Sequence, residues 1–190
     1  MPEDLSLQEG TYVEKAGSGR MTGKSGVIQM KKYEILIIAK NTDGIIARIM
    51  SLFNRRGYHA LKMTAGVTNK LGYTRLTLTV EGDDKILDQI QKQVYKITDV
   101  VKVKIFPKEN VIRRELMLLK VKANIETRAQ IVQIAEIYRG EVVDVSPDSV
   151  TMELTGDSQK LGGFVDIMES YGVLEIARTG VLAMSRGEKL

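Results

Sequence analysis

An internal repeat limits the fold of this chain more than any other feature of its sequence. Asn41 and Asn124 are 83 positions apart, and Gly57 and Gly140, which end the segments "RRG" and "YRG", have the same separation. Two matches at one offset indicate that one structural unit occurs twice. A later match, "EGDD" with "TGDS", is 74 positions apart, so the second unit is shorter before that point. The chain is therefore predicted to fold as two related but unequal units.

The hydrophobic pattern predicts the order β-α-β-β-α-β for each unit. In the first unit, strands are expected at 33–40, 58–68, 73–82 and 99–106, and amphipathic helices at 43–56 and 83–96. The same order restarts with a strand at 115–124 and ends with a strand at 173–184. This is the split βαβ, or ferredoxin-like, arrangement. The predicted fold class is α+β, with two tandem ferredoxin-like units.

The predicted boundaries divide the 190 residues into four parts. Residues 1–32 contain several glycines among polar neighbours and are expected to be a flexible tail. The first unit is assigned to 33–107, a connector to 108–114, and the second unit to 115–190. The first strand contains "ILIIA", which is apolar on both faces, although helices cover only one face of such a sheet. Its other face is expected to pack on the second unit, on a second copy of the chain, or on a different protein.

The composition argues against most enzyme classes. The chain has no cysteine, so it has no thiolate nucleophile, and a reducing cytoplasmic location is favoured. A histidine-based triad has only His59 to use, and no phosphate-binding or dinucleotide motif follows a predicted strand. No residues have the spacing of metal ligands. We therefore predict no catalytic residue and no metal site, and the apolar runs are too short to span a membrane.

The net charge of +4 and the pI near 9.2 raise the possibility of nucleic-acid binding. Acidic residues are interleaved with the basic ones, however, whereas nucleic-acid binders concentrate basic residues on one face. RNA-binding domains of this topology also need exposed aromatic residues on the central strands, and "ILIIA" and "LTLTV" contain none. Nucleic-acid binding is therefore disfavoured.

Gly44 stands where the first helix is expected to begin, just after Asp43, which is expected in the first turn. Glycine in a helix costs about 1 kcal/mol relative to alanine. The corresponding residue of the second unit is Thr127, which suggests that the fold itself does not require glycine here.

A bare helix N-terminus offers unpaired amides and a partial positive charge, which together bind a carboxylate. The Asn41 amide can contact the polar end of a ligand, and Ile45 and Ile46 can contact an apolar side chain. The combination suits a free amino acid. The alternatives are that Gly44 only eases a tight turn and that Asn41 is a turn residue.

The segment "NTDGIIARIMSLFNRRGYHALKMTAG" resembles the signature of the ACT domain, an amino-acid-sensing module of this topology. The whole span from Tyr33 to Leu190, including "YRGEVVDVSPDSVTMELTGDSQKL" and "ARTGVLAMSRGEK", resembles the regulatory (small) subunit of acetohydroxyacid synthase, also called acetolactate synthase. The first 32 residues lie outside the resemblance.

The resemblance implies a non-catalytic chain that activates a large catalytic subunit and confers feedback inhibition by valine or another branched-chain amino acid. Thiamine diphosphate, Mg²⁺ and FAD are expected in that catalytic partner, and no cofactor is expected in this chain. Paired ACT domains of a homodimer are expected to form the effector sites. An ACT protein that regulates a different enzyme is the alternative.

The resemblance also implies which residues bind the effector. They are Asn41, Asp43, Gly44, Ile45, Ile46 and His59. His59 stands where the family commonly has an asparagine that contacts the effector from the neighbouring protomer. This departure bears on which amino acid is bound.

Overall fold

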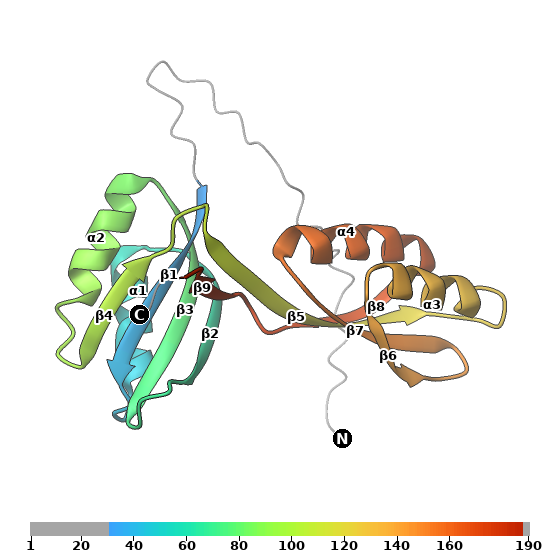
Figure 1. The fold of residues 1–190 in the computed structure, drawn as a ribbon, viewed down its shortest axis with the longest axis horizontal. Helices are drawn as coiled ribbons and strands as arrows, with labels where there is room; N and C mark the ends of the chain where they lie inside the picture. The colour runs from blue at the N-terminus through green and yellow to red at the C-terminus, as the bar shows by residue number, and fades with distance from the viewer. Residues whose placement is uncertain (1–30, 188–190) are drawn as a thin grey trace, which may run out of the picture.

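The computed structural model describes residues 31–187, so the predicted tail lies outside the described residues except for Lys31 and Lys32, which begin the first strand. Two antiparallel sheets follow one another along the chain, each with two helices on one face (Figure 1). The prediction of an α+β fold with two tandem ferredoxin-like units is confirmed.

The first sheet has the strand order β2-β3-β1-β4. It consists of β1 (Lys31–Lys40), β2 (Ala60–Val67), β3 (Tyr73–Gly82) and β4 (Val100–Ile105), and its helices are α1 (Ile45–Arg56) and α2 (Asp84–Val94). Alternate residues of a strand face opposite sides of the sheet. Ile35 and Ile37 of β1 therefore face the helices, where they are fully buried with Leu78, Ile49 and Phe53. This core holds α1 and α2 on one face of the sheet.

The second sheet has the strand order β6-β7-β5-β8. It consists of β5 (Val111–Lys122), β6 (Glu141–Val145), β7 (Ser149–Gly156) and β8 (Val173–Arg178), and its helices are α3 (Arg128–Ile137) and α4 (Ser158–Met168). A single-turn 3₁₀ helix, η1 (Glu169–Tyr171), follows α4. Met117, Leu119, Met152 and Phe164 are fully buried in the second core. The two units thus have separate cores.

The C-terminal region differs from the expected single strand at 173–184. It contains two strands, β8 and β9 (Leu182–Ser185), which are separated by a bend at Gly180 with φ of 84°. β9 pairs with residues 111–114, which form the start of β5 and not part of the expected connector. β5 is therefore shared: its first residues pair with β9, and its remaining residues belong to the second sheet.

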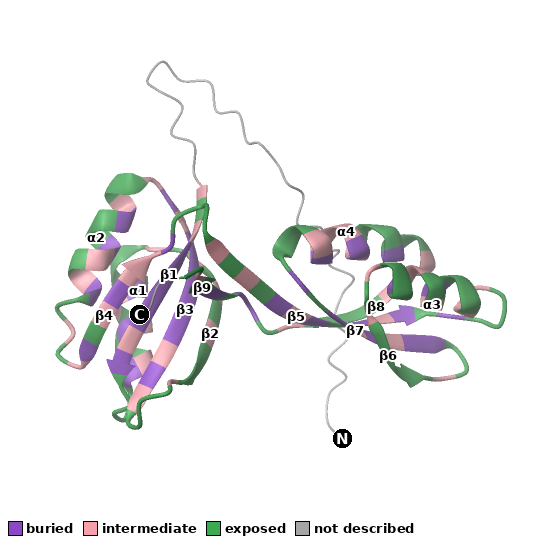
Figure 2. Cartoon of the chain, viewed as in Figure 1, coloured by how far each residue is buried: buried purple, intermediate pink, exposed green. Residues whose placement is uncertain are grey.

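The ribbon formed by β9 and residues 111–114 covers the outer face of the first sheet. Leu36, Phe106 and Ala183 form a small buried cluster between the ribbon and the sheet. The Arg113 guanidinium also donates to the Glu34 carboxylate at 2.8 Å. Both faces of β1 are consequently buried, as the purple segments in Figure 2 show. Of the three partners expected to cover this face, the one found in the structure is a segment from the second half of the same chain.

Candidate functional site

The predicted effector residues, apart from His59, lie in or beside the tight turn between β1 and α1. Within this turn, Thr42 N–H donates to the Lys40 carbonyl at 2.9 Å, and Ile45 N–H donates to the Thr42 carbonyl at 3.1 Å. Asn41 N–H donates to the Gly72 carbonyl at 2.8 Å, which connects the turn to the β2–β3 hairpin. These hydrogen bonds determine the backbone path into α1.

Gly44 has a left-handed backbone conformation, with φ of 73°, immediately before α1. This conformation is costly for residues with a side chain, so the turn itself requires glycine. Thr127 has φ of −91°, so the second unit makes the corresponding turn differently. The inference that the fold makes no demand on Gly44 is therefore wrong. The expectation for Asp43 is also wrong, because α1 begins at Ile45 and has no acid in its first turn.

The N-terminus of α1 is nevertheless open to a ligand. Among the described residues, none caps α1 with a side-chain hydrogen bond, and a Cβ placed on Gly44 would meet no atom within 4 Å. The first amides of a helix lack intrahelical partners, and the helix dipole makes this end partially positive. The Ile45 N–H is already bonded to the Thr42 carbonyl, but the amides that follow it in the first turn of α1 can be presented to a carboxylate without a side chain at Gly44 in the way.

The side chains predicted to bind the effector differ in how exposed they are at the N-terminus of α1. Asn41 and Asp43 are exposed, and Ile46 is half-buried against the first core. Ile45 is only 3% exposed and belongs to that core. Ile46 is therefore the isoleucine that borders the surface, whereas Ile45 anchors the start of the helix.

Asn124, the counterpart of Asn41, shows why only the first unit has an open turn. Its side-chain carbonyl accepts from Thr127 N–H at 2.8 Å and from Glu126 N–H at 3.0 Å. The second unit thus satisfies its own turn amides with its asparagine. The Asn41 side chain has no hydrogen-bond partner within residues 31–187, so it remains available to a ligand.

A network that sequence reasoning missed supports the open turn. Arg48 Nη2 donates to Asp99 Oδ2 at 2.6 Å and to Thr42 Oγ1 at 2.8 Å, and Thr42 Oγ1 donates to Asp99 Oδ2 at 3.0 Å. The hydrogen bonds from Arg48 and Thr42 lower the pKa of Asp99 below its ordinary value. Because Asp99 is more than 50 positions away in sequence, no local pattern identifies this contact.

His59 lies at the opposite end of the first sheet from the turn. The next residue, Ala60, is in register with Val80, which is in register with Tyr33 near the start of β1. The turn follows Lys40, and the seven positions from Tyr33 to Lys40 span roughly 23 Å of extended strand. Within one chain, the structure brings together Asn41, Asp43, Gly44 and Ile46, but not His59.

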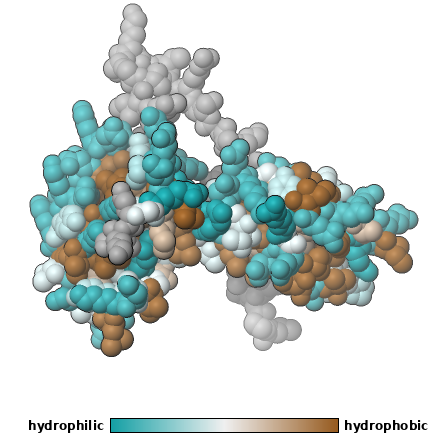
Figure 3. All heavy atoms as spheres, in the orientation of Figure 1, coloured by the Kyte–Doolittle hydropathy of each residue, from teal (hydrophilic) through white to brown (hydrophobic). Residues whose placement is uncertain are grey.

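β2, which begins just after His59, is an edge strand of the first sheet. Its exposed large apolar side chains are Leu61, Met63 and Val67, with 44%, 40% and 89% exposure. Figure 3 shows further apolar patches among the mainly hydrophilic atoms of both halves of the molecule. An unpaired edge with apolar side chains is suited to pairing with another strand.

The first unit has two surface grooves that do not include the turn residues. One lies between α1 and α2 and is lined in part by Arg48, Arg55 and Lys96, and the other is lined in part by Tyr33 and Phe106. Neither groove includes Asn41 or Gly44. Within residues 31–187, no cluster of His, Asp and Glu could hold a metal ion, and no helix is long and apolar enough to cross a membrane.

Two family models match the chain, one in each unit. Residues 41–103 match the ACT domain, and residues 114–187 match the family described as the small subunit of acetolactate synthase. The fold and these matches thus define a two-unit α+β protein whose first described unit contains an ACT domain.

Relatives across the whole described region identify the family. The probable acetolactate synthase small subunit of Archaeoglobus fulgidus is 42% identical over 83% of this chain and 99% of its own length. The small subunit of Mycolicibacterium smegmatis is 38% identical over 83% of this chain and 92% of its own length. The crystal structure of the small subunit from Thermotoga maritima has a TM-score of 0.78 and 37% identity, and the match covers 84% of this chain and 99% of that one. The chain belongs to the acetolactate synthase small subunits.

Proposed function

We propose that this chain activates the catalytic subunit of an acetolactate synthase and makes it sensitive to inhibition by valine or another branched-chain amino acid. Membership of the small-subunit family supports a regulatory role without catalysis. In this proposal thiamine diphosphate, Mg²⁺ and FAD belong to the catalytic subunit, with which the chain assembles. The absence of cysteine supports a reducing cytoplasmic setting.

The open β1–α1 turn is the observation that supports an effector site most strongly. Because the Ile45 N–H already donates to the Thr42 carbonyl, the amino-acid carboxylate would accept from the amides that follow Ile45 in the first turn of α1, in front of Gly44. The side chains of Asn41 and Asp43 are exposed and can contact the ammonium group, and Ile46 can contact an aliphatic side chain. The polar and apolar ends of valine thus have separate partners.

A second copy of the chain would complete this site. If two β2 edges pair antiparallel about a twofold axis, the start of one β2 meets the end of the other. The end of β2 is close to the turn, because Val67 is in register with Thr74, and Thr74 with Ala39. His59 of one protomer would then lie beside the turn of its partner, which the distance within one chain prevents.

Regulation in this proposal depends on a difference in affinity. Valine can shift the catalytic subunit toward a less active state only if it binds one arrangement of the assembly more tightly than the other. The second unit, in which Asn124 satisfies the corresponding turn, is proposed to make assembly contacts instead of binding valine.

Titration calorimetry with valine tests the site in the variants Gly44→Asp and Gly187→Asp. Both glycines have positive φ, 73° and 67°, and open space around a Cβ, so the two substitutions impose similar backbone strain. We expect saturable binding by the unaltered chain and by Gly187→Asp, and none by Gly44→Asp, because the new carboxylate repels that of valine. Failure of the unaltered chain to bind valine, leucine or isoleucine would contradict the proposal.

Co-purification distinguishes this proposal from the alternative, in which the chain regulates a different enzyme. When the tagged chain is purified from cell extract, a catalytic subunit that requires thiamine diphosphate for acetolactate formation should co-purify with it. Retention of an unrelated enzyme instead would favour the alternative.

A further inference from the structure

Glu115 occupies the point at which β5 passes from the first half of the molecule to the second. Residues 111–114 pair with β9, whereas residues from Glu115 onward pair with β7. The Glu115 side chain is 0% exposed. A buried carboxylate is costly unless it is paired and hydrogen-bonded, so its contacts restrict how the two halves can be arranged.

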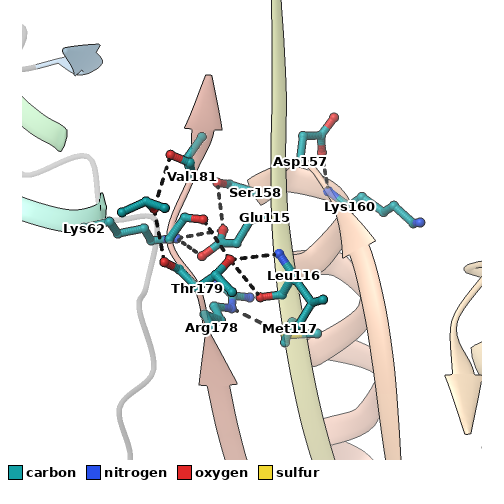
Figure 4. A network of polar contacts seen from close by, with 12 residues as sticks. Lys62, Glu115, Leu116, Met117, Asp157, Ser158, Lys160, Arg178, Thr179 and Val181 are labelled. Atoms are coloured by element: carbon teal, nitrogen blue, oxygen red, sulfur yellow. Dashed lines mark hydrogen bonds and ion pairs between the residues drawn. The ribbon is translucent and has the colours of Figure 1, made fainter. Parts of the chain in front are cut away.

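The Glu115 carboxylate connects three elements, as Figure 4 shows. Lys62 Nζ in β2 donates to its two oxygens at 3.1 and 3.2 Å. The hydroxyl of Ser158, the first residue of α4, donates to Oε2 at 3.5 Å. The edge strand of the ACT domain is thus linked through one buried group to a helix of the second unit.

The other chain connection between the halves also contacts β2. The Thr64 hydroxyl donates to the Thr179 carbonyl at 3.2 Å, between β8 and β9. Gly180 is buried, and a Cβ placed there would be 2.9 Å from Thr64 Oγ1 and 3.2 Å from the Met63 carbonyl oxygen. Only glycine therefore allows this close approach to β2.

Beyond these two points, the ribbon of β9 and residues 111–114 is held on the middle of the first sheet. Arg113 pairs with Glu34 of β1, and Arg75 of β3 donates to the Ala183 carbonyl. The ribbon is thus fixed to the central strands, while the second unit departs from it at Glu115 and Thr179. Both departure points are held by β2, which has a strand on only one side.

We propose that β2 couples the effector site to the orientation of the second unit through the Lys62–Glu115 pair and the contact of Thr64 with residues 179–180. This inference rests on the proposed function, in which His59 contacts the effector of the neighbouring protomer. Lys62 and Thr64 lie in β2, which begins directly after His59, and follow that residue by three and five positions. A small shift of β2 on effector binding therefore moves both contacts and changes the angle between the units.

Distance measurements between spin labels test this coupling. The chain has no cysteine, so Gln89→Cys in α2 and Glu136→Cys in α3 place labels at one exposed position in each unit. Labelled chains are mixed with excess unlabelled chains, so that only the distance within one chain is measured. We expect valine to shift the distance distribution of this background.

Two variants remove the two links independently. Lys62→Met with Glu115→Leu replaces the buried ion pair by apolar side chains without leaving a carboxylate unpaired. Gly180→Ala forces residues 179–181 away from Thr64. The matched control is Lys92→Met with Asp88→Leu, which removes an exposed ion pair in α2 with an N–O distance of 2.6 Å. We expect each link variant to lose the valine-induced shift and the control to retain it, with valine still binding by calorimetry in all three.

The outcomes separate this inference from the proposed function. Valine binding with an unchanged shift in both link variants overturns the coupling and leaves the effector site intact. Valine binding with no shift in the labelled background overturns the coupling as well. Absence of binding of valine, leucine and isoleucine, both in that background and in the unaltered chain, overturns both. Circular dichroism establishes that each variant is folded, and Lys62→Arg, which keeps the charge, should keep the shift.

Discussion

Arg48 and Asp99 form an ion pair of 2.6 Å that joins the first turn of α1 to the residue before β4. The same carboxylate accepts from the Thr42 hydroxyl at 3.0 Å, inside the β1–α1 turn. The shape of the candidate effector site therefore depends on a residue that does not belong to the turn.

Asp99→Asn should weaken valine binding several-fold, because the neutral amide holds Arg48 and Thr42 less firmly than the carboxylate. Calorimetric titration measures the change in the dissociation constant. Asp88→Asn is the control, since it removes the charge of an ion pair of equal length that is remote from the turn. Equal affinities in the two variants would show that the network does not determine the site.

The low pKa of Asp99 predicts an acid-sensitive contribution to folding stability. A carboxyl group whose pKa is lower in the folded state than its ordinary value of 3.8 stabilises the fold above that value. This contribution is lost as the pH falls through the folded-state pKa. Urea unfolding at several pH values should show that the unaltered chain and Asp99→Asn differ above about pH 4 and converge at lower pH. A difference that does not change with pH would contradict the assignment.

Thr77 has a buried hydroxyl without a hydrogen-bond partner among the described residues, and it is only 2% exposed. Thr77→Val should raise the free energy of unfolding by about 1 kcal/mol, because it replaces the unpaired hydroxyl with a methyl group of similar size. The Thr68 hydroxyl, in contrast, donates to the Lys70 carbonyl at 2.8 Å. Thr68→Val should therefore not stabilise the chain. Urea unfolding of both variants measures the contrast.

Leu36 anchors the ribbon of β9 and residues 111–114 on the first sheet. It is 0% exposed, so Leu36→Ala should lower the free energy of unfolding by about 2–5 kcal/mol through loss of buried contacts and a cavity. Leu71 is 99% exposed, and Leu71→Ala should change the free energy of unfolding by less than about 0.5 kcal/mol. Similar effects in the two variants would mean that the ribbon does not pack on β1.

Local patterns were sufficient to predict the main elements of the fold. The period of the apolar residues identifies the strands and helices of both units, and the repeat at one offset identifies their common topology. The local pattern does not predict the split of the last strand, because the apolar residues continue through Gly180, whose close approach to Thr64 involves a segment far away in sequence. The pairing of β9 with the start of β5 is likewise a contact between distant segments.

Only part of the candidate site can be predicted from the sequence. The sequence identifies Gly44 as an unusual residue at a helix start, but its backbone conformation cannot be inferred from Thr127, because the two turns differ in φ. Asp99 carries no local signal, since its partners Arg48 and Thr42 come close only after the sheet forms. The distance of His59 from the turn also follows from sheet register, which the sequence pattern leaves open.

The most direct test of regulation by this chain is the rate of acetolactate formation by the catalytic subunit, measured with and without this chain and with and without valine. We predict that the chain raises the rate, that valine lowers it only when the chain is present, and that Gly44→Asp preserves the activation but removes the valine effect. An unchanged rate on addition of the chain, or equal inhibition by valine in its absence, would contradict the account.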